Sequence, residues 1–224
     1  MNKEEFFKNG YAVEDINELF KDQNSLRIIR EAANELAQPQ YRQDHFNYRL
    51  NFEGVPYNSD SHVPVDKIQE KLREGIERKV KPTQRWYETK EFGKFLPTFD
   101  YIKESIEQYV ETIYDIKPDH YAHAQVNLTV YEDGDFIDPH SDGQNEGRLA
   151  IFLIYMSDPE KYNDGGGKLI IKDKNAGIDD SIIPTFGKFV ILEFTKNNIN
   201  HAVEPVKNGF VRTCFLAIVS ERKK

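Results

Sequence analysis

The sequence predicts a mainly β protein with N-terminal helices, in which the helices pack on an antiparallel sandwich or barrel. Two observations support this fold class. Up to about residue 120, apolar residues recur three and four positions apart, which is the spacing of amphipathic helices. Beyond it, short apolar, β-branched and aromatic runs start at or just after glycines, with no helical pattern between them. We expect a single domain over 1–224, mainly helical over 1–120 and with a β core over 121–220.

Four segments of the first half have the helical spacing. They are 14–23, 24–38, 63–80 and 97–116. In the last of them, Ile102, Ile106, Tyr109 and Ile113 form one stripe, which is typical of a helix that packs on a core. Residues 38–63 show no clear period and mix aromatic with polar residues. We expect a surface loop there, with a substrate-binding loop as the alternative.

Five runs of the second half are predicted strands: 122–134, 147–157, 167–173, 187–194 and 209–220. The first of these alternates clearly between apolar and polar residues. Its even positions 124–130 are apolar, whereas its odd positions are Gln125, Asn127, Thr129 and Tyr131. Side chains alternate across a strand, so the polar row faces either solvent or an internal pocket. We prefer the pocket, because this strand leads directly into His140.

Composition and charge exclude several classes of partner. The chain has 30 Lys and Arg against 38 Asp and Glu, a net charge of −8, so its overall field does not favour nucleic acid. No apolar run is long enough to cross a membrane, and the N-terminus lacks the apolar stretch of a signal peptide. Cys214 is the only cysteine, which suits a reducing compartment. We expect a cytoplasmic protein without a nucleic-acid or membrane partner.

A metal-binding pattern begins in the stretch "FIDPHSDG" at residues 136–143. In a strand, His140 and Asp142 would project from the same face. His201 follows the predicted strand 187–194 and a polar turn. Two histidines and one carboxylate with open coordination positions form the facial triad of non-haem Fe(II) oxygenases. Zinc accepts the same three ligands, so these residues alone leave both metals open.

A charged residue, Arg212, interrupts the otherwise apolar strand at 209–220. A guanidinium does not lose its proton on burial, so it requires an anion nearby. That anion is either a carboxylate of the protein or a dicarboxylate cosubstrate. The dicarboxylate favours iron over zinc. Lys207 is a competing cation, but it belongs to a turn whereas Arg212 belongs to a strand.

Residues 121–220 resemble the core of the 2-oxoglutarate- and Fe(II)-dependent dioxygenases, most closely the prolyl 4-hydroxylase-like subgroup. The resemblance rests on the order of His140, Asp142, His201 and Arg212, and on the stretches "YEDGDFIDPHSD", "RLAIFLIYMSD", "NDGGGKLIIKD" and "PTFGKFVILEF". One departure is that Arg212 lies slightly farther from His201 than is usual in this subgroup. The resemblance implies a double-stranded β-helix, a jelly-roll and cupin-like core, flanked by helices.

The same resemblance implies a chemistry and assigns roles. His140, Asp142 and His201 would bind Fe(II), and Arg212 with Tyr155 would hold the far carboxylate of 2-oxoglutarate. Tyr131 would contact the cosubstrate at its near end. The reaction would use O₂, with ascorbate as a reductant, and would hydroxylate an unactivated C–H bond with succinate and CO₂ as coproducts. Related halogenases lack the carboxylate ligand, so Asp142 favours hydroxylation over halogenation. Desaturation and ring formation use the same residues and are further alternatives.

The identity of the substrate is the part of the function that the sequence specifies least. Arg148, Asn127, Gln125 and Thr129 are the candidate substrate residues, and we expect a small molecule or an amino acid. Arg148 could bind a substrate carboxylate, with an ion pair to Asp142 or Glu146 as the structural alternative. The segments 38–63 and 141–147 are candidate lids. Alternatives are a hydroxylase of prolyl residues in a protein or peptide, a cupin-like metal isomerase or hydrolase, and a non-catalytic β-sandwich binding module.

Overall fold

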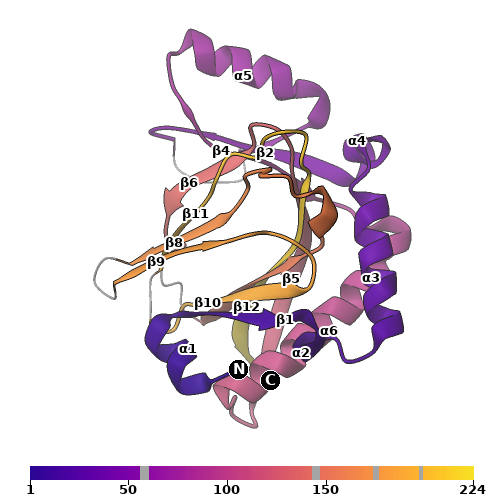
Figure 1. Ribbon diagram of the computed structural model, residues 1–224, viewed down its shortest axis with the longest axis vertical. Helices are drawn as coiled ribbons and strands as arrows, with labels where there is room; N and C mark the ends of the chain where they lie inside the picture. The colour runs from indigo at the N-terminus through magenta and orange to yellow at the C-terminus, as the bar shows by residue number, and fades with distance from the viewer. Residues whose placement is uncertain (56–60, 143–146, 174–176, 197–198) are drawn as a thin grey trace.

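The computed structural model describes residues 1–55, 61–142, 147–173, 177–196 and 199–224. Its strands belong to one antiparallel sheet that curls around the centre of the molecule (Figure 1). The strands are β1 (Tyr11–Asp15), β2 (Phe46–Phe52), β3 (His62–Val63), β4 (Pro82–Thr89), β5 (His120–Tyr131), β6 (Phe136–His140), β7 (Arg148–Tyr155), β8 (Leu169–Asp173), β9 (Ile178–Ile182), β10 (Lys188–Glu193), β11 (Asn200–Val203) and β12 (Arg212–Lys223).

The order of the strands divides the sheet into two halves. The first half is β1-β10-β7-β12-β5 and the second is β6-β11-β8-β9, with β4 between β5 and β6. The halves face each other, because Leu153 and Leu216 of the first line the same cavity as Leu169 and Val203 of the second. This is the double-stranded β-helix, and the predicted fold class is confirmed. Each of the five predicted strands corresponds to an observed one, at β5, β7, β8, β10 and β12.

Helices cover the outer face of the first half of the sheet. The α-helices are α1 (Lys3–Asn9), α2 (Ile16–Leu19), α3 (Gln23–Leu36), α4 (Arg42–His45), α5 (Ile68–Glu77) and α6 (Leu96–Tyr114). Ile106 and Val110 of α6 are fully buried in one cluster with Phe152 and Phe189 of the sheet. The even positions 124–130 of β5 lie in the same cluster, so their predicted packing against the helices is confirmed. The odd positions lie on the opposite face of β5, and of these Thr129 and Tyr131 line the cavity inside the curl.

The N-terminal part contains strands that were not predicted from the sequence. Residues 38–63 were expected to be a loop, but they include α4, all of β2 and β3, so this prediction is wrong for most of the segment. The signal for β2 was present, because Phe46, Tyr48 and Leu50 alternate with polar residues at the period of a strand. The strand pairs with β4. Residues 56–60, at the tip of the expected binding loop, lie outside the described residues.

Helix α5 and strands β2 and β3 form a layer of their own beside β4, at the end of the molecule opposite the two termini (Figure 1). Ile68 of α5 packs with Tyr48, Leu50 and Val63 in a small separate cluster. Because β4 also pairs with β5 and β6, this layer is hydrogen-bonded into the main sheet. No helix among the described residues is long and apolar enough to cross a membrane.

Candidate metal centre and cosubstrate pocket

A cavity of about 390 Å³ lies between the two halves of the sheet. One wall comes from the first half and is largely apolar, with Ile151, Leu153, Leu192, Leu216 and Ile218. The opposite wall carries His140, Asp142 and His201, and Arg212 lies in the same cavity. This size is within the usual range of small-molecule sites. Side chains far apart in the sequence therefore meet in one pocket. Of the polar row of β5 that was predicted to face a pocket, Thr129 and Tyr131 line it.

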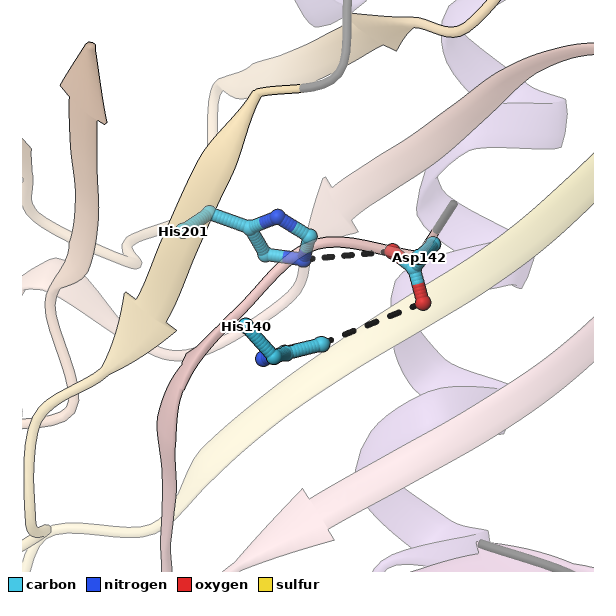
Figure 2. Close-up of side chains that lie close together, drawn as sticks. All are labelled: His140, Asp142 and His201. Carbon is cyan, nitrogen blue, oxygen red and sulfur yellow. Dashed lines mark ion pairs between the residues drawn. The ribbon is translucent and has the colours of Figure 1, made fainter. Parts of the chain in front are cut away.

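The two histidines meet because their strands are neighbours. β6 pairs with β11, and His140 lies directly opposite His201 in the register. Directly opposite residues of an antiparallel pair hold their side chains on the same face. The chain leaves β6 immediately after His140, and Asp142 returns toward both rings from the following loop (Figure 2). The neighbouring part of the expected lid, residues 143–146, lies outside the described residues.

The three side chains have the geometry of a metal site. The Nε2 atoms of His140 and His201 lie 3.9 and 3.4 Å from the carboxylate oxygens of Asp142. One ligand atom of each residue lies within 4.8 Å of the other two. The Nδ1 atom of His140 is 2.9 Å from the carbonyl oxygen of Asp138, and that of His201 is 3.2 Å from the carbonyl oxygen of Ile199.

These carbonyl contacts decide which nitrogen faces the centre. A carbonyl accepts only from a protonated nitrogen, so Nδ1 carries the proton in both rings and the lone pair of Nε2 points toward Asp142. Burial, followed by the neighbouring His140, lowers the pKa of His201. A neutral imidazole with its Nε2 lone pair directed inward is the form that binds a metal ion.

Arg212 is buried in the cavity without a compensating charge. Its side chain is 1% exposed, and its Nε donates to the carbonyl oxygen of Gly167 at 3.0 Å. Its guanidinium lies over the rings of Tyr131 and Tyr155, with the carbon 4.6 and 5.3 Å from the ring centres. Within the described part of the chain no carboxylate lies within ion-pair distance, and Nη2 has no hydrogen-bond partner. Lys207, the competing cation, is instead exposed and paired with Asp164.

Of the two tyrosines next to Arg212, only Tyr131 is among the residues that line the cavity. Tyr131 lines it and stacks on Trp86, with ring centres 5.9 Å apart. Tyr155 is fully buried beside Arg212, and its hydroxyl has no hydrogen-bond partner among the described residues. Burial raises the pKa of both phenols, so both remain protonated and are available as donors. Thr129 also lines the cavity, but its hydroxyl donates to the carbonyl oxygen of Cys214 at 3.0 Å.

The candidate substrate residues are not all brought together. Arg148 lines the cavity, and its Nη1 lies 3.4 Å from the backbone carbonyl oxygen of Asp142, not from its carboxylate. Glu146, the other acid considered for Arg148, lies outside the described residues. Gln125 is exposed and lines a separate hollow next to α6, together with Asn127. The amide of Asn127 nevertheless donates to Glu88 at 2.9 Å, and Glu88 lines the main cavity.

Strand β4 supplies a wall of the cavity that sequence reasoning missed. Gln84, Trp86 and Glu88 alternate along β4 and all line the cavity, next to Arg49 of β2. The stretch "PTQRWYET" does not alternate between apolar and polar residues, so the sequence carried no clear signal for this wall. β4 acquires this position only by pairing with β5 and β6 at the junction of the two halves.

Residues 126–219 match the sequence profile of the 2OG-Fe(II) oxygenase superfamily. This stretch, a little under half of the chain, belongs to that superfamily. The match includes His140, Asp142, His201 and Arg212. Among curated proteins, none matches this chain significantly.

Solved structures show where the fold of this oxygenase recurs. A prolyl hydroxylase from Trichoplax adhaerens, in complex with a peptide of a hypoxia-inducible factor, is 14% identical in sequence and superposes with a TM-score of 0.64. The match covers 98% of this chain and 87% of the hydroxylase chain. A Pseudomonas putida prolyl-4-hydroxylase is 14% identical, with a TM-score of 0.57 and coverage of 97% and 96%. A 2OG-Fe(II) oxygenase family oxidoreductase from Burkholderia pseudomallei is 11% identical, with a TM-score of 0.59 and coverage of 97% and 88%.

At these identities the likeness concerns the fold, and it supports the predicted prolyl 4-hydroxylase-like architecture. The superfamily uses Fe(II), 2-oxoglutarate and O₂, and the cluster of His140, Asp142 and His201 is a candidate iron site of that kind. The protein is therefore a dioxygenase of the 2-oxoglutarate-dependent class. The alternatives of a cupin-like isomerase or hydrolase and of a non-catalytic binding module are not supported.

Proposed function

We propose that this oxygenase hydroxylates a small molecule that carries a carboxylate, such as an amino acid. In this proposal His140, Asp142 and His201 hold Fe(II), and Arg212 with Tyr155 holds the far carboxylate of 2-oxoglutarate. Tyr131 lies along the cosubstrate, and Arg148 binds the carboxylate of the substrate. Ascorbate would serve as an external reductant.

The observation that carries the proposal is the uncompensated charge of Arg212. A buried guanidinium without an anion is costly, and a protein retains it where a ligand supplies the anion. Nη2 of Arg212 and the hydroxyl of Tyr155 are buried donors without partners among the described residues. A carboxylate placed between them would accept from both. A diacid bound there would direct its other end toward the cavity that contains the two histidines.

The donor set also fits iron. Two imidazoles and one carboxylate occupy one side of a metal ion and leave the remaining positions for ligands. The backbone carbonyls of Asp138 and Ile199 fix both rings in the tautomer that coordinates through Nε2. When bound, Fe(II) and 2-oxoglutarate supply the activation of O₂ and the insertion of one oxygen atom into a C–H bond, with succinate and CO₂ as coproducts.

The protein itself contributes positioning and exclusion of water. Arg212 and the tyrosines orient the diacid, and the apolar side chains of Ile151, Leu153 and Leu216 offer bulk water no hydrogen-bond partner. Arg148 supports a carboxylate on the substrate because it has no ion pair among the described residues and contacts the backbone of Asp142. A substrate anion at Arg148 would thus lie next to the metal ligands.

The first test measures iron and cosubstrate turnover. The purified protein should bind about one Fe(II) and convert 2-oxoglutarate to succinate slowly without substrate, and His201→Ala should lose the iron. A screen of amino acids, other small acids and proline-containing peptides, read by succinate release, then identifies the substrate class. Stimulation by the peptides alone would contradict the small-molecule proposal and support a prolyl hydroxylase.

The second test isolates Arg212. We expect Arg212→Met to retain iron but to bind 2-oxoglutarate roughly a hundredfold more weakly, because it loses charge-assisted hydrogen bonds to the diacid. The ligand-free variant should be as heat-stable as the wild type or more so, because the buried uncompensated charge is gone. Binding is measured by the fluorescence of Trp86, the only tryptophan. Lys207→Met is the matched control, and an unchanged affinity in Arg212→Met would rule out the assigned anchor.

A further inference from the structure

A second charged group faces the cavity on the wall formed by β4. The Glu88 carboxylate accepts from Nε of Arg49 at 2.5 Å and from the amide of Asn127 at 2.9 Å. These three residues come from β4, β2 and β5, and the side chain of Glu88 is 13% exposed. His62 lies 3.7 Å from the same carboxylate. Burial, followed by the Arg49 guanidinium, lowers the pKa of His62, so that ring is neutral and adds no positive charge.

The geometry leaves Glu88 able to accept more. A carboxylate has about four acceptor positions, and Arg49 and Asn127 occupy one on each oxygen. Both partners approach from neighbouring strands, so they hold the carboxylate in place while it lines the cavity. A fixed acceptor of this kind binds a donor more strongly than a mobile surface carboxylate does, because little side-chain entropy remains to be lost.

The same cavity combines this acceptor with a cation and an apolar surface. Arg148 lines the cavity and has no ion pair among the described residues. The lining of the cavity also includes the aliphatic side chains of Ile151, Leu153, Leu216 and Ile218. A ligand that satisfies all three has a carboxylate, a protonated amine and an aliphatic carbon chain.

We propose that Glu88 binds the protonated amine of the substrate, and that the substrate is a free aliphatic amino acid. This inference rests on the proposed function and narrows its substrate class. Asn127 and Arg49 act as positioning residues, because they orient the carboxylate of Glu88.

The first experiment uses the wild-type protein loaded with Fe(II) and 2-oxoglutarate. The probes are the twenty proteinogenic L-amino acids and 6-aminohexanoic acid, with succinate release as the readout. For the most effective probe, the acid with the same carbon skeleton but without the amine is then compared. We expect the amine to raise kcat/KM by about ten- to a hundredfold, which is the usual effect of a hydrogen bond to a charged group.

The second experiment tests Glu88 itself. Glu88→Gln should reduce the preference for the amine over the amine-free acid to about threefold or less, mainly through KM, and Glu88→Asp should restore part of it. A purely structural role would instead lower turnover of both acids equally and leave their ratio unchanged. Glu91→Gln, at an exposed position just after β4, is the matched control and should keep the wild-type ratio.

The outcomes separate this inference from the proposed function. If wild-type protein turns over 2-oxoglutarate but none of these probes accelerates it, the amine subsite is wrong and the oxygenase activity stands. An amine-free acid that is as good a substrate, or a Glu88→Gln variant with the wild-type ratio, also overturns it. If 2-oxoglutarate is not turned over and iron is not bound, the proposed function itself fails.

Discussion

Buried polar side chains in this protein differ in whether the chain itself provides their partners. The carboxylate of Glu193, at the end of β10, accepts from the backbone amides of Thr195 and Lys196. Asp135 accepts from the hydroxyl of Tyr48 and from the backbone amide of Glu132. Such groups stabilise local structure, since each buried acceptor is satisfied.

Arg212 contrasts with these residues because its Nη2 remains a donor without an acceptor among the described residues. The hydroxyl of Tyr155 and the side-chain oxygen of Gln84, an acceptor that lines the cavity, likewise have no hydrogen-bond partner among the described residues. A polar group that is buried and unsatisfied destabilises the fold. Three such atoms close to one cavity therefore indicate selection for a ligand and not for stability.

Asp135 gives a pH-dependent prediction. It is 2% exposed, and burial raises its pKa to about 6, against the opposing effect of the Tyr48 hydroxyl, the Glu132 amide and Arg85. An acid whose pKa is raised by folding binds its proton more tightly in the folded state. Its contribution to stability is thus greatest below pH 4 and decreases as the pH rises from about 4 to about 6, by about 3 kcal/mol.

The measurement compares urea unfolding of wild type and Asp135→Asn between pH 4 and 7. The variant has the same shape without the titrating group, so the difference in unfolding free energy isolates Asp135. We expect the unfolding free energy of the wild type to fall relative to that of Asp135→Asn as the pH rises. A shift in favour of the wild type would mean that Arg85 and Tyr48 stabilise the ionised carboxylate more than burial penalises it.

At the scale of elements, the loop before β8 positions the buried arginine. Gly166 forms a bridge with Val206, and the amide of Gly167 lies 3.4 Å from the carbonyl oxygen of Pro205. The carbonyl oxygen of Gly167 then accepts from Arg212. The three successive glycines of "NDGGGK" permit this close approach of two backbones, since Gly166 has a φ of +63°. The loop thus connects the β11–β12 turn to the cosubstrate end of the cavity.

Gly166→Ala should be one of the more damaging single substitutions outside the metal ligands. A Cβ at this position would lie 2.2 Å from the carbonyl oxygen of Pro205, and the positive φ adds its own cost. We expect a loss of about 2–5 kcal/mol in unfolding free energy, measured by urea denaturation. Gly177→Ala is the control, because Gly177 has a φ of +69° with nothing within 4 Å of the added Cβ. Equal losses in both variants would show that the contact with Pro205 relaxes freely.

At the scale of the whole molecule, β4 unites the parts of the chain. It pairs with β2 on one side and with both β5 and β6 on the other. Trp86 is inserted from β4 into a cluster with Tyr131 and Val203 of the core. The helices α3 and α6 share their buried cluster with the sheet. The helices α3 and α6 and the β core therefore share one hydrophobic interior, which supports the prediction of a single domain.

We expect the metal-free chain to unfold in one cooperative step. Trp86 fluorescence reports on the β4 junction, whereas far-ultraviolet circular dichroism reports mainly on the helices. In urea, the two signals should give the same midpoint. Separating β4 from β5 and β6 exposes both the main hydrophobic cluster and the small cluster of α5, β2 and β3. Two separated midpoints would show that α5 with β2 and β3 unfolds independently, and the single-domain prediction would then be wrong.

Much of the architecture was predictable from local pattern. Alternation and glycine positions identified β5, β7, β8, β10 and β12, and the apolar spacing identified α3 and α6. The spacing of His140 and Asp142, with His201 and Arg212 downstream, predicted a metal-binding cluster and a buried cation. The structure shows the elements, the cluster of the three side chains and the burial of Arg212. These features were predictable because side-chain periodicity and the cost of burying a charge are local properties of a sequence. Metal binding by the cluster stays a prediction.

Long-range strand pairing determines the rest. Gln125 and Asn127 share one strand face, yet Gln125 faces solvent and Asn127 reaches Glu88, because β4 pairs with β5 only at Val130 and Thr129. Nothing in the pattern of β4 indicates that Trp86 and Glu88 line the cavity. Which strands become neighbours depends on contacts between residues distant in the chain, and no local periodicity encodes them. The convergence of two distant histidines by the pairing of β6 with β11 has the same origin.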